Sequence, residues 1–204
     1  MKPASALLIS LLTPLVGAIP VRDPRQSSQI QITGVSTSGS GCPQGSVSTN
    51  ISPDGSVLTL GFDSYQTLVG PGASGSDREK NCDVFLTLRF PVGVCTAATL
   101  SITYHGFAEI ESDVAGSLAA SYTLSPGSGG GNPPATTFTA SNWSGGGVYT
   151  RQDAVSASAT IQNPNQRDVS LAVRTRLILS ASNSGASGTL TADDATVAIA
   201  QRRC

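Results

Sequence analysis

The stretch Val84-Phe85-Leu86-Thr87-Leu88-Arg89-Phe90 indicates how this chain folds. Its even positions are all large and apolar, whereas a phenylalanine, a threonine and an arginine stand between them. Successive side chains of a β-strand point to opposite faces, so this alternation places one apolar row against a core and leaves the other row outside it. Residues 84–90 are therefore predicted to form a half-buried strand.

The same alternation recurs on both sides of this strand, and no segment shows the period of a helix. About nine strands are predicted, and they include residues 30–32, 47–51, 57–60, 84–90, 100–104, 118–124, 155–161, 169–179 and 189–200. Antiparallel strands without intervening helices bury their apolar rows by stacking two sheets or by closing a barrel. Sheets of this length usually stack, so we predict an all-β fold, an antiparallel β-sandwich.

Two segments rich in glycine and proline connect the predicted strands in different ways. Pro53-Asp54-Gly55 lies between residues 47–51 and 57–60, and its residue types favour a tight hairpin turn. Residues 125–147 are too many for such a turn, and we expect them to form a mobile or a glycosylated loop. Within them, Gly127 to Gly131 lacks the lysine and the following helix of a phosphate-binding loop.

The first residues have the features of an export signal. Lys2 supplies a positive charge, residues 4–16 are mostly apolar, and Val16-Gly17-Ala18 offers the small residues of a cleavage site. Residues 1–18 are predicted to be a secretory signal peptide, too short to span a membrane, and residues 19–28 a flexible leader or a short pro-segment. Residues 29–204 are expected to form one β-sandwich domain, extracellular or cell-wall associated, without membrane insertion.

The four cysteines fit an exported protein. An even number of cysteines in an oxidising compartment is expected to pair, which predicts two disulfides. We favour Cys42 with Cys82 and Cys95 with Cys204, because the second bond would hold a chain terminus that otherwise frays. The wide spacings, and the lack of a C-x-x-C motif, argue against a metal site and against a redox pair.

Two short sequences are acceptors for N-linked glycans. They are Asn50-Ile51-Ser52 and Asn142-Trp143-Ser144. A glycan must stand in solvent, so both asparagines are predicted to be glycosylated and to lie at the surface.

The charge balance excludes several classes of function. The 204 residues include 13 acidic and 12 basic side chains and one histidine, so the chain lacks the basic surface that nucleic acids require. A single histidine also leaves little for a metal site, and neither a metal nor a cofactor is expected. His105 would be the base of any Ser-His-Asp mechanism, and no G-x-S-x-G sequence presents a serine to it. We therefore predict a protein that is not an enzyme.

Three alternating carboxylates form the first candidate site. A continuous strand would place Glu109, Glu111 and Asp113 on one face, about 6.6 Å apart along the chain. Such a row could contribute to a glycosidase pair or to a calcium site, although each of those needs further groups from other segments. A solvated edge with like charges is the alternative interpretation.

Three aromatic residues in or beside the glycine-rich segment form the second candidate site. Phe138, Trp143 and Tyr149 could offer a platform on which a sugar ring stacks. The alternative is a loop whose rings fold back onto the sandwich. Arg174 and Arg176 share one strand face, which is expected to be solvated, and Arg78-Glu79-Lys80 is expected to be an exposed loop.

Four short sequences together resemble one family of exported proteins. They are Gly41-Cys42-Pro43, Gly45-Ser46-Val47, Arg78-Glu79-Lys80-Asn81-Cys82 and Tyr104-His105-Gly106-Phe107-Ala108. The resemblance, over roughly residues 29–204, is to the domain of unknown function 4360 family of filamentous fungi and bacteria. It implies a small, secreted, cysteine-bearing protein of one domain and supplies no catalytic residue. Bacterial members often carry a basic residue at the place of His105, so the resemblance gives that residue no family-wide role.

These features favour a secreted, non-enzymatic protein that recognises another molecule outside the cell. Its partner would be a cell-wall polysaccharide or an extracellular protein, which includes a host protein if the chain is a fungal effector. One alternative is a carboxylate-dependent glycoside hydrolase or lyase that uses Glu109 or Glu111. Another is a structural coat protein of the cell surface, which the low charge and the many serines and glycines suggest.

Overall fold

The computed structural model describes residues 29–93, 95–160 and 165–203. Within these ranges the chain forms thirteen β-strands and two short helices. In chain order the elements are β1 (Gln31–Ser38), β2 (Val47–Ile51), β3 (Val57–Phe62), β4 (Gln66–Val69), η1 (Gly75–Asp77), β5 (Glu79–Arg89), β6 (Cys95–Ile110), β7 (Val114–Ser125), β8 (Ser128–Gly131), β9 (Thr136–Thr139), α1 (Ala140–Trp143), β10 (Gly147–Thr160), β11 (Asp168–Ala181), β12 (Gly188–Thr191) and β13 (Asp194–Arg203). The predicted signal peptide and leader lie outside the described residues.

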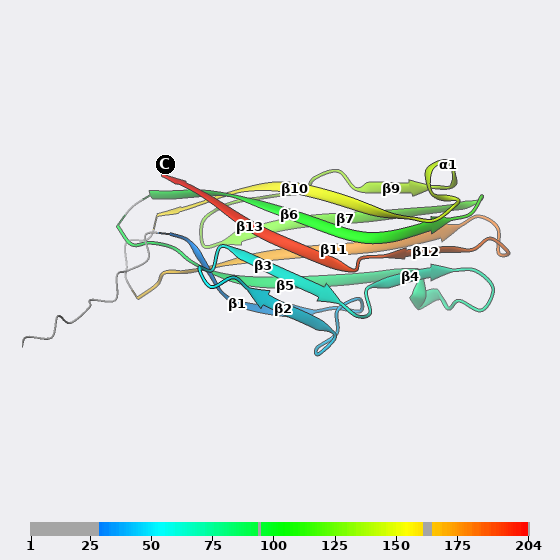
Figure 1. The fold of residues 1–204 in the computed structure, drawn as a ribbon, viewed down its shortest axis with the longest axis horizontal. Helices are drawn as coiled ribbons and strands as arrows, with labels where there is room; N and C mark the ends of the chain where they lie inside the picture. The colour runs from blue at the N-terminus through cyan, green and yellow to red at the C-terminus, as the bar shows by residue number, and fades with distance from the viewer. Residues whose placement is uncertain (1–28, 94, 161–164, 204) are drawn as a thin grey trace, which may run out of the picture.

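The strands form two antiparallel layers that are continuous with each other (Figure 1). One layer, the β5 sheet, has the order β1-β5-β11-β7, and the other, the β6 sheet, has the order β10-β6-β13-β3-β2. Strand β8 pairs with both β7 and β10 and so joins the layers along one side. On the other side β1 approaches β2, and the Ile32 N–H donates to the Gly55 carbonyl at 2.8 Å. The fold is all-β as predicted, but it is one nearly barrel-shaped sheet because β8 bridges the two layers.

The inward rows of both layers form the core, as the alternation predicts. In β5 the residues at 84, 86 and 88 are buried, whereas Arg89 is exposed. The same pattern runs through β6, β7, β10 and β11. Leu86, Leu100 and Leu171 are almost inaccessible to solvent and pack in a single cluster with the other buried side chains. Removal of these apolar rows from water is the main source of the stability of the fold.

The structure has thirteen strands, four more than the nine predicted. Strands β4, β8 and β9 were not predicted, since each has only four residues and is too short to show a period of two. The predicted last strand, residues 189–200, is two strands, β12 and β13. It breaks because β12 pairs with β4 and the far end of β6, whereas β13 pairs with β3 and the rest of β6. The predicted end of β10 at Ile161 lies outside the described residues.

The segment from 125 to 147 is not a simple loop, which corrects the prediction. It contains β8, β9 and α1, and Figure 1 shows β9 and α1 together at one end of the barrel. Strand β9 pairs with β7 and carries Phe138, which is fully buried. The prediction failed because strands of four residues show no clear period, and because the pairing of β8 with β10 and of β9 with β7 joins residues at least 18 apart in the sequence.

The predicted hairpin at Pro53-Asp54-Gly55 is confirmed. Strands β2 and β3 are antiparallel, with Ile51 opposite Leu58. The Asp54 carboxylate accepts hydrogen bonds from Ser52 Oγ at 2.6 Å and from the Ser56 backbone N–H at 3.1 Å. These donors favour the ionised form and lower the pKa of Asp54 from its usual 3.8 to about 2.

The predicted disulfide between Cys42 and Cys82 is also confirmed. It links the connection between β1 and β2 to strand β5, with the two Cα atoms 5.3 Å apart. Cys95 is disulfide-bonded, but Cys204 lies outside the described residues, so the second pairing stays a prediction. The strand register supports it, because Arg203 on β13 is opposite Thr96 on β6.

Candidate functional site

The outer face of the β6 sheet consists of short, mostly uncharged side chains. Residues directly opposite each other on neighbouring strands share a face, so the registers define rows across the sheet. One such row is Asn50, Thr59, Thr196, Thr103 and Gln152. Further along the strands come two rows of smaller residues, Ala198 with Ser101 and Ala154, then Ala200 with Thr99 and Ser156. This face therefore offers hydroxyl and amide groups above a surface of low relief.

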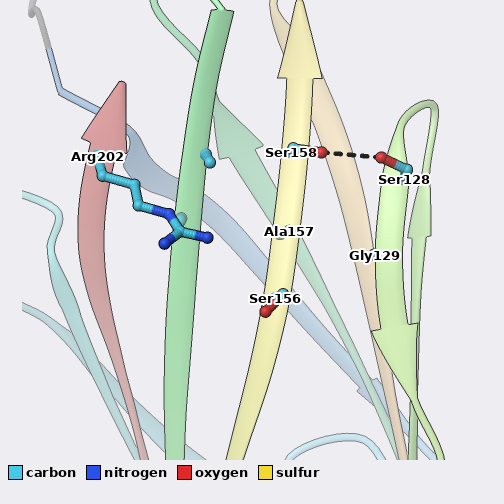
Figure 2. A pocket seen from close by; sticks show the side chains of 8 residues that line it. Ser128, Gly129, Ser156, Ala157, Ser158 and Arg202 are labelled. Carbon is cyan, nitrogen blue, oxygen red and sulfur yellow. Dashed lines mark hydrogen bonds between the residues drawn. The ribbon is translucent and has the colours of Figure 1, made fainter. Parts of the chain in front are cut away.

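A hollow of about 570 Å³ lies where these rows end, over strands β13, β6, β10 and β8 (Figure 2). Its lining is three alanines, three serines, one glycine and Arg202. Ser128 on β8 and Ser158 on β10 hydrogen bond through their hydroxyls at 2.8 Å, which ties the two sides of the hollow together. Because the other side chains are so small, a ligand here would approach the backbone of the sheet closely.

Arg202 supplies the one charged side chain among the lining residues. It is opposite Ala97, and Figure 2 shows its side chain extending from β13 across β6. A methyl group at position 97 leaves room for the guanidinium above the sheet. Within the described residues Arg202 has neither an ion pair nor a side-chain hydrogen bond. Its planar fork of N–H donors is therefore available to a ligand.

The residue types of the hollow restrict what it can do chemically. The lining contains no carboxylate, imidazole or thiol, so it has no general acid or base and no activated nucleophile. Serine hydroxyls both donate and accept hydrogen bonds, and the guanidinium only donates. Such a set suits recognition of a ligand that is itself rich in hydroxyl groups.

The predicted aromatic platform is assembled but mostly buried. The ring centroids of Phe138 and Tyr149 are 4.8 Å apart, and Trp143 stands edge-on to Phe138 at 5.4 Å. Phe138 is 0% exposed and Tyr149 6% exposed, whereas Trp143 is half-buried. The rings fold back onto the barrel, which is the alternative that the sequence left open. Of the three, only Trp143 presents an appreciable part of its ring to solvent.

The predicted row of three carboxylates does not form. Glu109 lies near the end of β6, but the strand ends at Ile110, so Glu111 and Asp113 belong to the following turn. Glu111 accepts a hydrogen bond from the Ser187 N–H at 2.7 Å, and Asp113 has a positive φ of 68°. All three side chains are exposed, and none lines the hollow. In the part of the chain that the structure describes, no three His, Cys, Asp or Glu side chains form a group that would hold a metal ion.

His105 lies on the outer face of the β6 sheet beside the buried Tyr104. Its Nδ1 atom is 2.7 Å from Asp194 Oδ1, and the side chains of both residues are nearly half exposed. The strand register accounts for this pair, since Asp194 on β13 is directly opposite His105 on β6. The imidazole is therefore outside the hollow and is held by a neighbouring strand.

A buried polar network that was not predicted joins the two sheets. Arg151 on β10 donates through Nη1 to the carbonyl of Leu118 on β7 and through Nε to Asp153 Oδ2 at 3.1 Å. Tyr122 on β7 donates to the same Asp153 oxygen at 2.6 Å. Arg151 Nη2 lies 3.0 Å from Asp153 Oδ2 but in no hydrogen-bond geometry. The network spans the gap between β7 and β10, which we call the seam.

Burial of this network has a clear electrostatic consequence and a signal in the sequence. Removal from water disfavours the phenolate, so burial raises the pKa of Tyr122 far above its usual value of 10. Arg151 and Asp153 occupy the same face of β10 as the buried Tyr149 and Val155. Alternation with those residues predicts that both charges point inward, and an inward Arg-Asp pair must then be partnered.

The predicted glycosylation sites are both exposed. Asn50 lies on β2, at the edge of the β6 sheet farthest from β10, and Asn142 lies on α1. A glycan on Asn50 would therefore stand beside the outer face while strands β3 and β13 separate it from β6.

Comparison with known proteins identifies the family. Residues 28–204 match the family described as Domain of unknown function (DUF4360). The chain belongs to this family. It is also 31% identical, over 167 residues, to an uncharacterized secreted protein of the fungus Arthroderma benhamiae. That match covers 81% of this chain and 65% of the relative, so the chain spans just under two thirds of the relative's length.

Two solved structures show a weaker likeness. TmCBM61, solved with β-1,4-galactotriose, has a TM-score of 0.29 and 10% identity, with 85% of this chain and 91% of that chain covered. The N-terminal cellulose-binding domain of the Cellulomonas fimi β-1,4-glucanase C has a TM-score of 0.20 and 14% identity, with 79% and 97% covered. At these TM-scores the likeness carries no argument. None of the helices that the structure describes is long and apolar enough to cross a membrane.

Proposed function

We propose that this protein is a secreted, non-enzymatic module that binds cell-wall polysaccharide through the hollow on the outer face of the β6 sheet. The hollow carries the proposal, because it combines a floor of small residues with serine hydroxyls and a guanidinium that has no side-chain partner among the described residues. A sugar ring presents hydroxyls that both donate and accept, and it can lie close to a floor of alanine, serine and glycine.

The rows that lead into the hollow favour a polymer over a single sugar. Thr103, Thr196 and Gln152 continue the polar face along the strands, so successive residues of an extended chain would meet similar groups. The face carries few charges, which suits a neutral polysaccharide. A protein partner is the less favoured choice, because interface cores are rich in aromatic anchors and the lining of this hollow has none of them.

Export is part of the proposal and rests on several features. The predicted signal peptide, the Cys42–Cys82 disulfide and the exposure of both sequons fit passage through an oxidising secretory route. Glycans on Asn50 and Asn142 would leave the hollow open, because neither asparagine lines it. Action as a fungal effector would use the same surface against a host polysaccharide.

The proposal is tested by retention of the secreted protein on insoluble glucan, chitin and cellulose. Ala97→Trp fills the hollow with a large ring, and Arg202→Gln removes its guanidinium. Both are expected to reduce retention about tenfold or more on any polymer that binds. The Trp ring would occupy the space of the ligand, and loss of a charge-assisted hydrogen bond to a ligand costs about 1.5–3 kcal/mol.

Matched controls lie on the opposite face of the barrel. Ser170→Trp adds the same ring to an exposed position of β11, and Arg89→Gln removes an exposed guanidinium from β5. Both controls should bind like the unaltered protein. Failure of every polymer to retain the protein, or equal retention of Ala97→Trp and Ser170→Trp, would overturn the proposal.

The hydrolase and lyase alternative is tested in the same experiment. Release of reducing ends or unsaturated products from the polymers, lost in Glu109→Gln or Glu111→Gln, would replace a binding module by an enzyme. Recovery of the protein only from an insoluble wall fraction that resists competing soluble sugar would favour the structural coat protein instead.

A further inference from the structure

The outer face of the β5 sheet carries charged side chains where β5 and β11 face each other. The register places Arg89 opposite Asp168 and Asp83 opposite Arg174. A third combination is diagonal, because Arg176 is opposite Asn81, two residues from Glu79. Three pairs of opposite charge thus follow one another along these two strands.

The pairs at the two ends are closed. Arg89 Nε donates to Asp168 Oδ1 at 2.9 Å, and Arg176 Nε donates to Glu79 Oε1 at 2.6 Å. Glu79 and Lys80 are the first residues of strand β5, which corrects the prediction of an exposed loop at residues 78–80. In both pairs the charges satisfy each other and leave little for a ligand.

The middle pair is open. Asp83 and Arg174 stand directly opposite each other, and such residues have Cβ atoms only about 4.5–5.5 Å apart. Within the described ranges, however, neither side chain has an ion pair or a hydrogen bond. At this separation the long Arg174 side chain could reach the Asp83 carboxylate easily. A donor and an acceptor therefore remain available side by side.

A hollow of about 430 Å³ lies at this open pair. Its lining includes Asp83, Arg174 and Asn81, whose Oδ1 accepts a hydrogen bond from Ser40 Oγ at 2.9 Å. On the neighbouring strand β7, the residues opposite Arg174 and Arg176 are Ser121 and Ala119, both small. The floor thus falls from long charged side chains to short ones, which provides space for a ring beside the open pair.

We propose that this hollow is a second saccharide-binding site, in which Arg174 donates and Asp83 accepts hydrogen bonds to adjacent hydroxyls of a neutral sugar. A hydroxyl group can satisfy either partner, and the charge on each protein group strengthens the bond. The formal charges of the open pair cancel, so a neutral ligand fits better than an ionic one. The carboxylate of an acidic sugar would be attracted by Arg174 and repelled by Asp83, so its charge would add little net affinity.

This site does not rest on the hollow in the β6 sheet, because the whole core separates the two outer faces. The two proposals therefore fail separately. In an Arg202→Gln background the first hollow is weakened, and the neutral-polymer binding that is then lost on substitution of Arg174 or Asp83 belongs to the second.

Affinity electrophoresis of the secreted protein tests the second site. The gels contain neutral hydroxyethylcellulose, soluble glucan or mannan, or anionic polygalacturonate. In the Arg202→Gln background, at least one neutral polymer is expected to retard the protein. Addition of either Arg174→Gln or Asp83→Asn should weaken that binding about tenfold or more, as loss of a charge-assisted bond to a ligand does.

Matched charge changes and folding controls keep the result interpretable. Arg89→Gln and Asp168→Asn alter the closed pair by the same charges and should not change retardation. Thermal unfolding identifies any variant that fails to fold. No retardation by a neutral polymer in the Arg202→Gln background, or neutral binding that survives both Arg174→Gln and Asp83→Asn, would overturn the site. So would binding of polygalacturonate alone that strengthens in Asp83→Asn, because the site would then be anion-binding.

Discussion

The outer face of the β5 sheet carries several charged side chains that meet across strands, whereas the outer face of the β6 sheet carries mainly threonine, serine and alanine. Arg89 with Asp168 and Arg176 with Glu79 are ion pairs on the first face. On the second face, the row through Thr196 and Thr103 has no charge. The inward rows of the two sheets, in contrast, are both mainly apolar, with the buried Arg151–Asp153 pair on β10 as the charged exception.

This difference shows where a protein of this architecture can vary. Inward side chains must fill a shared core at close-packed density, and a change there is felt by both sheets. Outward side chains face solvent and need only be compatible with strand formation and with solubility. Recognition chemistry is therefore expected in the outward rows, with hydroxyl groups on one face and an open charge pair on the other.

The two outer faces belong to one folded body because the seam network joins the two sheets. Substitution in this network is expected to have the largest effect on stability. Asp153→Ala removes the carboxylate that accepts from Arg151 and Tyr122, and it leaves a buried guanidinium uncompensated. The free energy of unfolding should fall by about 3–5 kcal/mol in urea denaturation. Asp63→Ala, at an exposed aspartate, should change it by less than about 0.5 kcal/mol.

The double variant Arg151→Met with Asp153→Leu separates the cost of an orphaned charge from the value of the ion pair. Replacement of a buried pair by apolar side chains of similar volume is often neutral or stabilising. The double variant should therefore recover most of the unfolding free energy that Asp153→Ala loses. A double variant as unstable as Asp153→Ala would mean that the network holds the seam by its hydrogen bonds to β7.

The disulfide has the next largest expected effect, because it ties the connection between the two faces to β5. Conversion of both Cys42 and Cys82 to alanine releases a loop that the bond closes across 40 residues of sequence. Loss of this constraint should lower the free energy of unfolding by about 2–4 kcal/mol in urea denaturation.

Peptide mapping under non-reducing conditions should show Cys95 linked to Cys204 in the unaltered protein, and any other partner of Cys95 would contradict the predicted pairing.

The features that local sequence determines were predictable, and they include the strand at residues 84–90 and the hairpin at Pro53-Asp54-Gly55. Both depend only on alternation and on turn residues. Strand β8 was not predictable, since its glycines show no period and it is stabilised by pairing with Tyr122 and Ala157. Such partners are known only once the register of the sheet is known.

The candidate site was less predictable than the fold for the same reason. Arg202 and Ser128 are far apart in the chain, and only the order β13-β6-β10-β8 brings them to one hollow. The carboxylate row failed because alternation says nothing about where a strand ends, and β6 ends between Glu109 and Glu111. The aromatic rings lie mostly inside the barrel, because a hydrophobic ring in a glycine-rich segment is itself a candidate for the core, as Phe138 shows.

Substitutions on the two faces should also differ in how salt changes their effect on the unfolding free energy, and this effect is smaller. Glu79→Gln breaks an exposed ion pair on the β5 sheet and should cost about 0.2–1 kcal/mol of unfolding free energy at low salt. The cost should shrink in 1 M salt, where the screening length is about 3 Å. Thr196→Val on the β6 sheet removes a hydroxyl and should give a difference that salt does not change. Equal salt responses would mean that the charge pairs do not distinguish the faces.

The smallest expected effect compares one lowered aspartate pKa at each sheet. Hydrogen bonds from Ser52 and Ser56 lower the pKa of Asp54 at the β2–β3 hairpin to about 2, whereas a hydrogen bond and the charge of Arg89 lower that of Asp168 on β11. Salt should therefore raise the pKa of Asp168 and leave that of Asp54 nearly unchanged, because neutral donors are not screened. Carboxyl NMR titrations at low and high salt measure both values.

The pH dependence of Asp54 follows from the direction of its shift. Its folded pKa of about 2 is below the usual 3.8, so its contribution to stability is present above about pH 4 and is lost as the pH falls towards 2. The double variant Ser52→Ala with Ser56→Ala should return the pKa of Asp54 towards 3.8 and remove this dependence. Arg89→Gln should do the same for Asp168 and leave Asp54 unaffected. A shift of both aspartates in either variant would show that the hairpin and the β5 face are coupled through the barrel, and that the two outer faces are not independent surfaces.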